Sequence, residues 1–188
     1  MTGDGPAVSR LCVATAAGAR GPLSSIQEGR GFYRLHLMTD PADGAEFAVA
    51  SPGLDEVSLI GDLITALHEA AALAGCAKTA AWPQPPVVVG FHLGITRVTD
   101  DGFRGRGVDR ALALVRDPAI AVRASARVAL AGAAKAEPLL AAAITAAFFE
   151  DLCAAGMSAA GWQRVAPASA WLRLFDGPPP RRRPALVG

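Results

Sequence analysis

A strand, a glycine-rich turn and a helix in direct succession constrain the fold of this chain more than any other feature. Residues 87–93 form an apolar run with one glycine and one histidine, which is the strongest candidate for a central strand, and residues 95–98 continue it. Glycines and charged residues make up most of residues 101–107, which indicates a turn. A helix is predicted from residue 107 to residue 116. The pattern therefore predicts a helix that leads directly from the central strand.

Other hydrophobic patterns complete the predicted elements. Further strands are predicted over residues 11–15, 32–38, 47–50, 139–145, 162–165 and 170–174, and further helices over residues 54–74, 119–134 and 146–155. Gly75 stands where the helix over 54–74 is expected to end. Residues 16–31 are expected to form a loop with at most one helical turn, and residues 76–85 an exposed loop. The order predicts an α+β fold, a ferredoxin-like or palm-like βαββαβ sandwich with helices on one face of a mainly antiparallel sheet.

Length and composition fit one domain. The chain has 188 residues, of which 52% are hydrophobic, and this is enough to bury a sizeable core. We expect residues 9–175 to form the domain, residues 1–8 to be a flexible leader, and residues 176–188 to be a disordered tail rich in proline and arginine.

Charge and cysteine usage exclude several functional classes. A formal net charge of +1 gives no electrostatic reason to expect nucleic-acid binding. No apolar stretch approaches the ~20 residues of a membrane-spanning helix, and the N-terminus lacks the pattern of a signal peptide. Cys12, Cys76 and Cys153 are odd in number and widely spaced, which disfavours a disulfide framework or a zinc site. We therefore expect a cytoplasmic protein with no metal, no cofactor and no membrane partner.

Residues 90–98 followed by residues 101–114 resemble the strand, loop and helix of class III nucleotidyl cyclases, which make cyclic AMP or cyclic GMP. The similarity in the order of elements covers roughly residues 9–175. In that family the 3′ hydroxyl of the substrate attacks its own α-phosphorus, and two divalent metal ions activate this oxygen and hold the leaving phosphates. The resemblance implies one metal-binding aspartate after the first strand and another at the tip of the central hairpin. It also implies an asparagine and an arginine, four residues apart on a helix, that orient the ribose and neutralise the transition state.

This chain departs from the family pattern at each of those charged positions. The aspartate after the first strand falls on or near Ala16, and the aspartate of the hairpin falls at Gly44 or Ala45. On the helix, Asp109 stands at the asparagine position and Ala113 at the arginine position. Each loss removes several kcal/mol of transition-state stabilisation, so the usual turnover is not expected.

A remnant of the pocket would contain five polar residues, namely Asp43, Glu46, Arg104, Arg106 and Asp109. The carboxylates of Asp43 and Glu46 are displaced from the metal positions, and solvated hairpin residues are the simpler interpretation. Residues 43–49 also resemble the Gly-Gly-Asp-Glu-Phe signature of diguanylate cyclases, with alanine at the central aspartate. Arg104 and Arg106 flank glycines in a loop that could hold an anion through its amides, although an ordinary exposed turn is simpler. Asp109 is interpreted as a residue that interacts with the amides at a helix start.

The histidines and tryptophans carry no recognisable site pattern. His36, His68 and His92 share no metal-ligand spacing, so we expect them to be solvated or hydrogen-bonded singly. Trp162 and Trp171 are expected to close the edge of the core.

The resemblance implies a catalytically inactive cyclase-like domain that serves as a regulatory or protein-interaction module in bacterial signalling. Its expected partner is a second copy of the chain, or a cyclase-like or effector protein, because active relatives form head-to-tail homodimers. One alternative is a nucleotide-sensing domain without turnover, which would hold a nucleotide through residues 101–107. A second alternative is an enzyme with a repurposed pocket that uses Asp43, Glu46 or His92.

Overall fold

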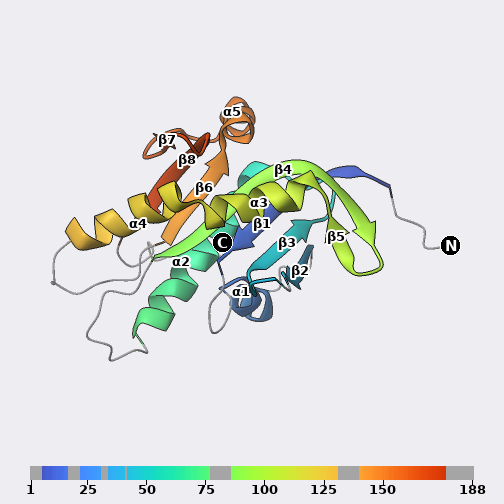
Figure 1. The fold of residues 1–188 in the computed structure, drawn as a ribbon, viewed down its shortest axis with the longest axis horizontal. Helices are drawn as coiled ribbons and strands as arrows, with labels where there is room; N and C mark the ends of the chain where they lie inside the picture. Colours follow the sequence, from blue (N-terminus) through green and yellow to red (C-terminus); the bar gives the residue numbers. More distant parts are fainter. Residues whose placement is uncertain are drawn as a thin grey trace, which may run out of the picture.

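The computed structural model describes residues 6–16, 22–30, 34–40, 42–76, 86–130 and 140–176. In these ranges the chain forms an eight-stranded sheet with helices on both faces (Figure 1). The strands are β1 (Val8–Thr15), β2 (Leu35–Thr39), β3 (Glu46–Ala50), β4 (Val87–Thr99), β5 (Gly102–Arg104), β6 (Leu140–Thr145), β7 (Gln163–Val165) and β8 (Ala170–Phe175). The helices are α1 (Pro22–Arg30), α2 (Glu56–Cys76), α3 (Arg106–Arg116), α4 (Pro118–Leu130) and α5 (Ala146–Ala154).

The sheet begins with a ferredoxin-like unit. The strands follow the order β2-β3-β1-β4-β6-β8-β7, and β5 pairs with β4 outside this path. The first six elements run β1-α1-β2-β3-α2-β4, and β1 lies between β3 and β4. Neighbouring strands are antiparallel except for β4 and β6, which are parallel. The predicted α+β fold with a mainly antiparallel sheet is therefore confirmed.

Two hydrophobic cores lie on opposite faces of the sheet. Along β1, Leu11 and Val13 enter the first core, whereas Cys12 and Ala14 enter the second, as strand alternation requires. Helices α1, α2 and α5 cover the first core, and α3 and α4 cover the second. Figure 1 shows α3 and α4 on the near side of the sheet and α2 behind it. The prediction of helices on one face was wrong, because β1 and β4 are apolar at successive positions and need cover on both sides.

Helix α3 lies directly against β4 and β1, and a glycine in its first turn makes this approach possible. A methyl group on Gly107 would lie 2.7 Å from the hydroxyl oxygen of Thr96 and 2.8 Å from the sulfur of Cys12. The same methyl group would lie 2.9 Å from the carbonyl oxygen of Gly94. Backbone and buried side chains surround the site, so a larger residue would have to push α3 away from the sheet.

Helix α1 replaces a predicted loop. The sequence of residues 16–31 is rich in glycine, serine and arginine and was expected to hold at most one helical turn, but Pro22–Arg30 is helical. Proline suits the first position of a helix because its missing N–H would have no helical partner. Leu23 and Ile26 are buried in the first core, so tertiary packing stabilises a helix that local propensity does not predict.

Several predicted boundaries also need correction. Helix α2 continues through Gly75 to Cys76, and Val8, which was predicted to lie in the leader, already belongs to β1. The predicted loop over 77–85 and the tail over 177–188 lie outside the described residues. None of the helices within the described ranges is long and apolar enough to cross a membrane.

Two glycine-to-alanine substitutions test the role of the α3 contact. Gly107→Ala is expected to lower the free energy of unfolding by about 1–3 kcal/mol, because the added methyl group overfills the contact. Gly61→Ala is the matched control, since that glycine lies on an exposed position of α2 with no atom near the new methyl group. It should raise the free energy of unfolding by about 0.5–1 kcal/mol through helix propensity. Chemical denaturation measures both, and a Gly107→Ala protein as stable as the original would contradict the close contact.

Candidate functional site

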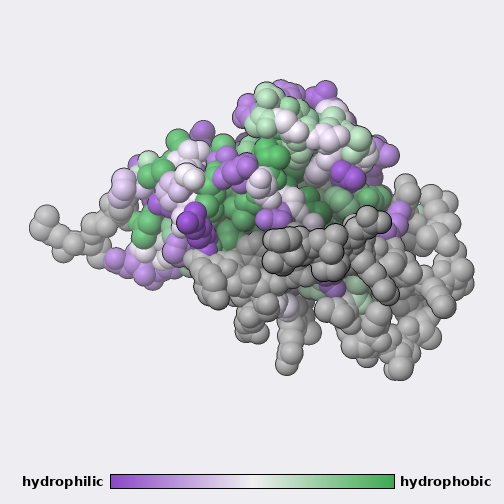
Figure 2. Space-filling view, turned by 180° about the vertical axis from the view of Figure 1, so that it is seen from behind, coloured by the Kyte–Doolittle hydropathy of each residue, from purple (hydrophilic) through white to green (hydrophobic). Residues whose placement is uncertain are grey.

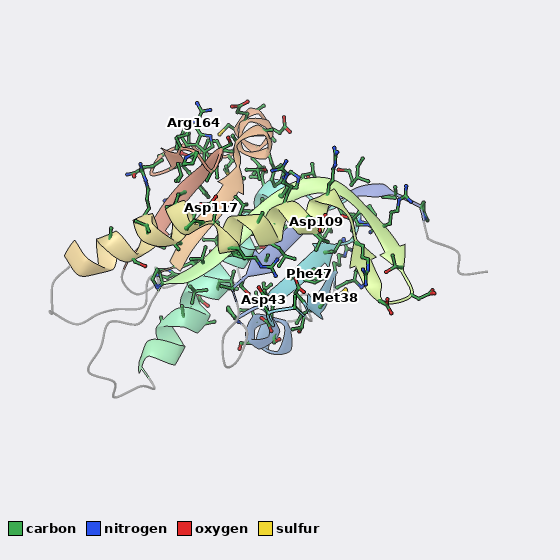
Figure 3. The ribbon with its side chains drawn as sticks, in the orientation of Figure 1. Met38, Asp43, Phe47, Asp109, Asp117 and Arg164 are labelled. Atoms are coloured by element: carbon green, nitrogen blue, oxygen red, sulfur yellow. The ribbon has the colours of Figure 1, made fainter. Side chains whose placement is uncertain are left out.

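The end of β1, the β2–β3 turn and the end of α3 meet at one corner of the sheet. Thr15 of β1 pairs with Glu46 of β3, which brings Ala16 beside the turn. The resemblance to cyclases places its two metal aspartates in this region, at Ala16 and at Gly44 or Ala45. Figure 3 shows Asp43 at this corner. The alanines and the glycine supply no side-chain oxygen, so any chemistry here depends on the neighbouring carboxylates.

Arg116, the last residue of α3, bridges two aspartates of the turn. Its Nη2 donates to Asp40 Oδ2 at 2.6 Å, and its Nε donates to Asp43 Oδ2 at 2.8 Å. The other two oxygens accept backbone hydrogen bonds of 2.9 Å, Asp40 Oδ1 from Ala42 and Asp43 Oδ1 from Ala45. All four carboxylate oxygens therefore accept a hydrogen bond from the chain itself.

The arginine also stabilises the ionised form of both aspartates. Its hydrogen bonds hold the pKa of Asp40 and of Asp43 below the ordinary aspartate value, and the backbone amides lower both further. The same contacts raise the pKa of Arg116 above its ordinary value. The Arg116 side chain is 41% exposed and the Asp40 side chain 18%, so water screens the attraction. The cluster therefore holds the turn against α3 in a defined position and adds only modest stability.

Glu46 lies on the other face of the sheet and caps α1. The residue is only 6% exposed. Its Oε2 accepts hydrogen bonds from the N–H groups of Leu23 at 2.9 Å and Ser24 at 3.3 Å, and its Oε1 accepts one from the Ser24 hydroxyl. Free N–H groups and the helix dipole favour an anion at this position, and the chain supplies its own. The expectation that Glu46 is a solvated hairpin residue was wrong, because strand alternation turns it toward the same face as Ala48.

The carboxylates of the corner do not converge on one point. Glu46 faces α1, whereas the next residue, Phe47, lies in the second core beneath α3. Asp43 contacts Arg116, which belongs to α3. A divalent cation needs several oxygen ligands in one place. Within the part of the chain that the structure describes, no three acidic, histidine or cysteine side chains form a group that could hold a metal ion.

The start of α3 holds the candidates that stand at the family's asparagine and arginine positions. Asp109 and Ala113 both lie exposed on this helix. Gly105 occupies the N-cap position, and no side chain caps this helix end, so Asp109 contributes through its charge alone. Asp109 precedes Arg116 by seven residues, which is about 10 Å along a helix axis. One copy of the chain therefore does not bring Asp109 to the aspartates of the turn.

The glycine-rich segment over 101–107 is ordered secondary structure and not an open loop. Residues 102–104 form β5, which pairs with the end of β4, and Arg106 already begins α3. Arg104 forms an exposed ion pair with Asp101 at 3.6 Å. Strand pairing uses residues 102–104, whereas no side chain among the described residues caps the first amides of α3, so anion binding at this segment stays a prediction.

His92 forms the clearest polar contact between distant strands. Its Nδ1 lies 2.8 Å from the hydroxyl oxygen of Thr145, one position beyond the last pair of the β4–β6 ladder, Phe91 with Ile144. Partial burial and the positive charge of Arg110 lower the pKa of His92 below its ordinary value. A neutral imidazole therefore extends the pairing of β4 and β6.

No protein-family model, curated protein or solved structure matches this chain. The assignment of the site therefore depends on the geometry of its own residues.

The remaining sequence candidates are structural. His36 stacks at a tilt with Phe103, and His68 is buried against Phe175. Burial raises the pKa of the Cys12 thiol to about 11, which disfavours a reactive thiolate. As predicted, the tryptophans close the core, with Trp162 buried and Trp171 stacked on Phe149.

Sequence patterns did not reveal the partners of the candidate carboxylates. Arg116 lies 73 residues from Asp43 in the chain and 76 from Asp40. Ser24 lies 22 residues from Glu46, in a segment predicted to be a loop. No local motif connects such pairs, because tertiary packing of α1 and α3 creates them.

Substitution of Glu46 tests whether it serves as the internal anion of α1. Glu46→Ala should lower the free energy of unfolding by about 1–3 kcal/mol, since it leaves buried donors without an acceptor. Glu150→Ala, on the exposed face of α5, should have little effect. Phosphate added to Glu46→Ala should restore stability more than it stabilises the original protein, because an external anion can then bind the helix end. Equal denaturation midpoints for the original protein and Glu46→Ala would contradict the cap.

The His92 contact predicts a pH dependence of stability. Because the pKa of folded His92 lies below the unfolded value of 6.5, its contribution is complete above that pH and is lost as the pH falls below it. His92→Gln keeps a hydrogen-bonding group but does not titrate in this range. The stability difference between the original protein and this variant should shrink as the pH falls from about 7 to about 5. His36→Gln, at an exposed position of β2, is the control, and a difference that stays constant over this range would overturn the assignment.

Proposed function

We propose that this chain is a catalytically inactive cyclase-like domain that acts as a regulatory or protein-interaction module in bacterial signalling. The observation that carries the proposal is that Asp40, Asp43 and Glu46 all accept hydrogen bonds from the chain itself. These carboxylates lie at the corner where the resemblance places the metal site. Arg116 and backbone amides donate hydrogen bonds to Asp40 and Asp43, and the first turn of α1 donates hydrogen bonds to Glu46. These groups stabilise the fold and leave no arrangement of oxygens for two divalent ions.

The β4–β5 hairpin is the proposed contact surface for a second copy of the chain. Figure 1 shows the hairpin extending past the helices near the N-terminal end. Ile95 is 58% exposed and Val98 is 40% exposed. Figure 2 shows hydrophobic and hydrophilic residues side by side at this end of the molecule. These two apolar side chains are the exposed groups that the proposed association would bury.

The hairpin is held firmly on its inner side. The ring of Phe103 lies under the guanidinium of Arg10, with 5.6 Å from the guanidinium carbon to the ring centroid, and 5.3 Å from the His36 ring. The N–H of Phe103 donates to the Met38 sulfur at 3.3 Å. A fixed hairpin loses little conformational entropy on association, which favours binding. Val98 lies on the same face of the hairpin as its pair partner Phe103, and Ile95 lies on the opposite face.

A second copy is the proposed partner because one copy separates the two halves of the cyclase-like site. Asp43 lies at the end of α3 and Asp109 near its start. Head-to-tail association, as the resemblance implies, would bring these ends of two copies together. A cytoplasmic location is part of the proposal and is supported by the cysteine pattern.

The two alternative functions have less support. A nucleotide sensor would need an open anion site, whereas β5 pairs residues 102–104 with β4 and Glu46 fills the start of α1. A repurposed enzyme would need its acid and base together, whereas Asp43 pairs with Arg116 and His92 pairs with Thr145.

Substitution of the hairpin tests the proposed association. The original protein should sediment as a dimer, and Ile95→Glu combined with Val98→Glu should convert it to a monomer, because a charge would be buried without a partner. Val122→Glu is the control, since Val122 is 67% exposed on α4, away from the hairpin. Analytical ultracentrifugation measures the mass of each variant.

Two outcomes would refute the proposal. A protein that remains monomeric at high concentration, or a dimer unaffected by the hairpin substitutions, would refute the contact surface. Cyclic product formed from ATP or GTP with Mg²⁺ or Mn²⁺, above a heat-inactivated control, would refute the inactive site.

A further inference from the structure

A pocket of about 500 Å³ lies beside the far edge of the sheet, between α4 and the strands β7 and β8. Leu172 and Leu174 of β8 and Ala126 of α4 contribute apolar surface to it. Arg123 of α4 and Gln163 of β7 contribute polar groups. Its volume falls within the ~300–1,000 Å³ of small-molecule sites, which combine an apolar lining with a few polar groups.

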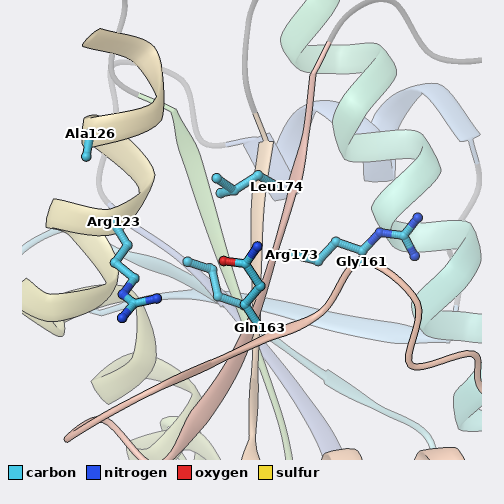
Figure 4. A pocket seen from close by; sticks show the side chains of 7 residues that line it. Arg123, Ala126, Gly161, Gln163, Arg173 and Leu174 are labelled. Carbon is cyan, nitrogen blue, oxygen red and sulfur yellow. The ribbon is translucent and has the colours of Figure 1, made fainter. Parts of the chain in front are cut away.

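The two polar side chains extend into the same space from different elements. Figure 4 shows Arg123 reaching from α4 toward Gln163, with Leu174 beside them. Among the described residues, neither side chain has a hydrogen-bond or ion-pair partner, and no carboxylate lines the pocket. An unpaired guanidinium next to an unpaired amide presents donors for an acidic group, and the planar guanidinium suits two oxygens at once.

Arg123 is the cation that faces this space. Arg173 also borders the pocket, but its guanidinium carbon lies 4.9 Å from the ring centroid of Phe175, and Figure 4 shows its side chain extending away from Arg123. The Gln163 amide can donate to a second oxygen of an acid. A ligand held this way would place its acidic group at Arg123 and its apolar part against the leucines.

We propose that this pocket binds a small organic anion, a carboxylate or a phosphate monoester with a short apolar body. The pocket shares none of its lining residues with the carboxylate corner or with the hairpin. The inference therefore stands apart from the proposed association and from the question of turnover.

Binding of three matched probes tests the proposal. Hexanoate, hexyl phosphate and hexylamine carry unbranched apolar chains of about the same length with different head groups, and isothermal titration calorimetry measures their affinity. Hexanoate, hexyl phosphate or both should bind saturably, whereas hexylamine should not. If only one acid binds, the result identifies the head group. Arg123→Gln should weaken acid binding about tenfold or more, since it removes a charge-assisted hydrogen bond.

Matched variants keep the test decisive. Arg164→Gln removes an arginine from the same strand as Gln163 but at a position that does not line the pocket, so it should leave binding unchanged. Arg123 is exposed on α4, so its substitution should preserve the fold, which circular dichroism checks. The proposal is overturned if neither acid binds saturably, if hexylamine binds as well as the acids, or if Arg123→Gln binds the acids with unchanged affinity.

Discussion

The close contact of α3 with β4 and β1 is the constraint on which the rest of this structure depends. Because Gly107 lacks a side chain, the first turn of α3 can lie against Thr96 and Cys12. The helix then runs over the sheet, and its last residue reaches the β2–β3 turn, where Arg116 meets Asp40 and Asp43. The position of this one helix thus covers the second core and places Arg116 between the two aspartates of the candidate site.

The carboxylates of the corner serve structure in two different ways. The guanidinium of Arg116 pairs with both Asp40 and Asp43 and offsets part of their mutual repulsion. Glu46 is not paired with a cation among the described residues; it is an anion that accepts hydrogen bonds from the N–H groups at the start of α1. Had the site only lost its metal ligands, the remaining acids would be expected to lie unpaired. If the chain descends from a cyclase, as proposed, the pairing of these acids indicates that they now stabilise the fold.

The sequence predicted most elements because their signals are local. The apolar run over 87–93 and the helical spacing over 54–74 depend only on neighbouring residues, and β4 and α2 follow them closely. Helix α1 could not be predicted this way, because Glu46 and the first core stabilise it from outside. The contacts of Arg116 with the two aspartates could not be predicted from local patterns either, since these partners lie more than 70 residues away in the chain.

The placement of helices on both faces could have been inferred more fully from the strands themselves. A strand with one solvated face alternates apolar and polar residues, whereas Val88, Val89 and Phe91 of β4 are all buried. Such a strand needs cover on both sides, and only two predicted helices, over 107–116 and 119–134, follow it before the next strand. These two form one connected layer, because only Asp117 separates α3 from α4 and both helices pack on the second core. The same layer therefore carries Arg116 at one sheet corner and Arg123 at the far pocket, which explains how a single helix pair shapes two separate sites.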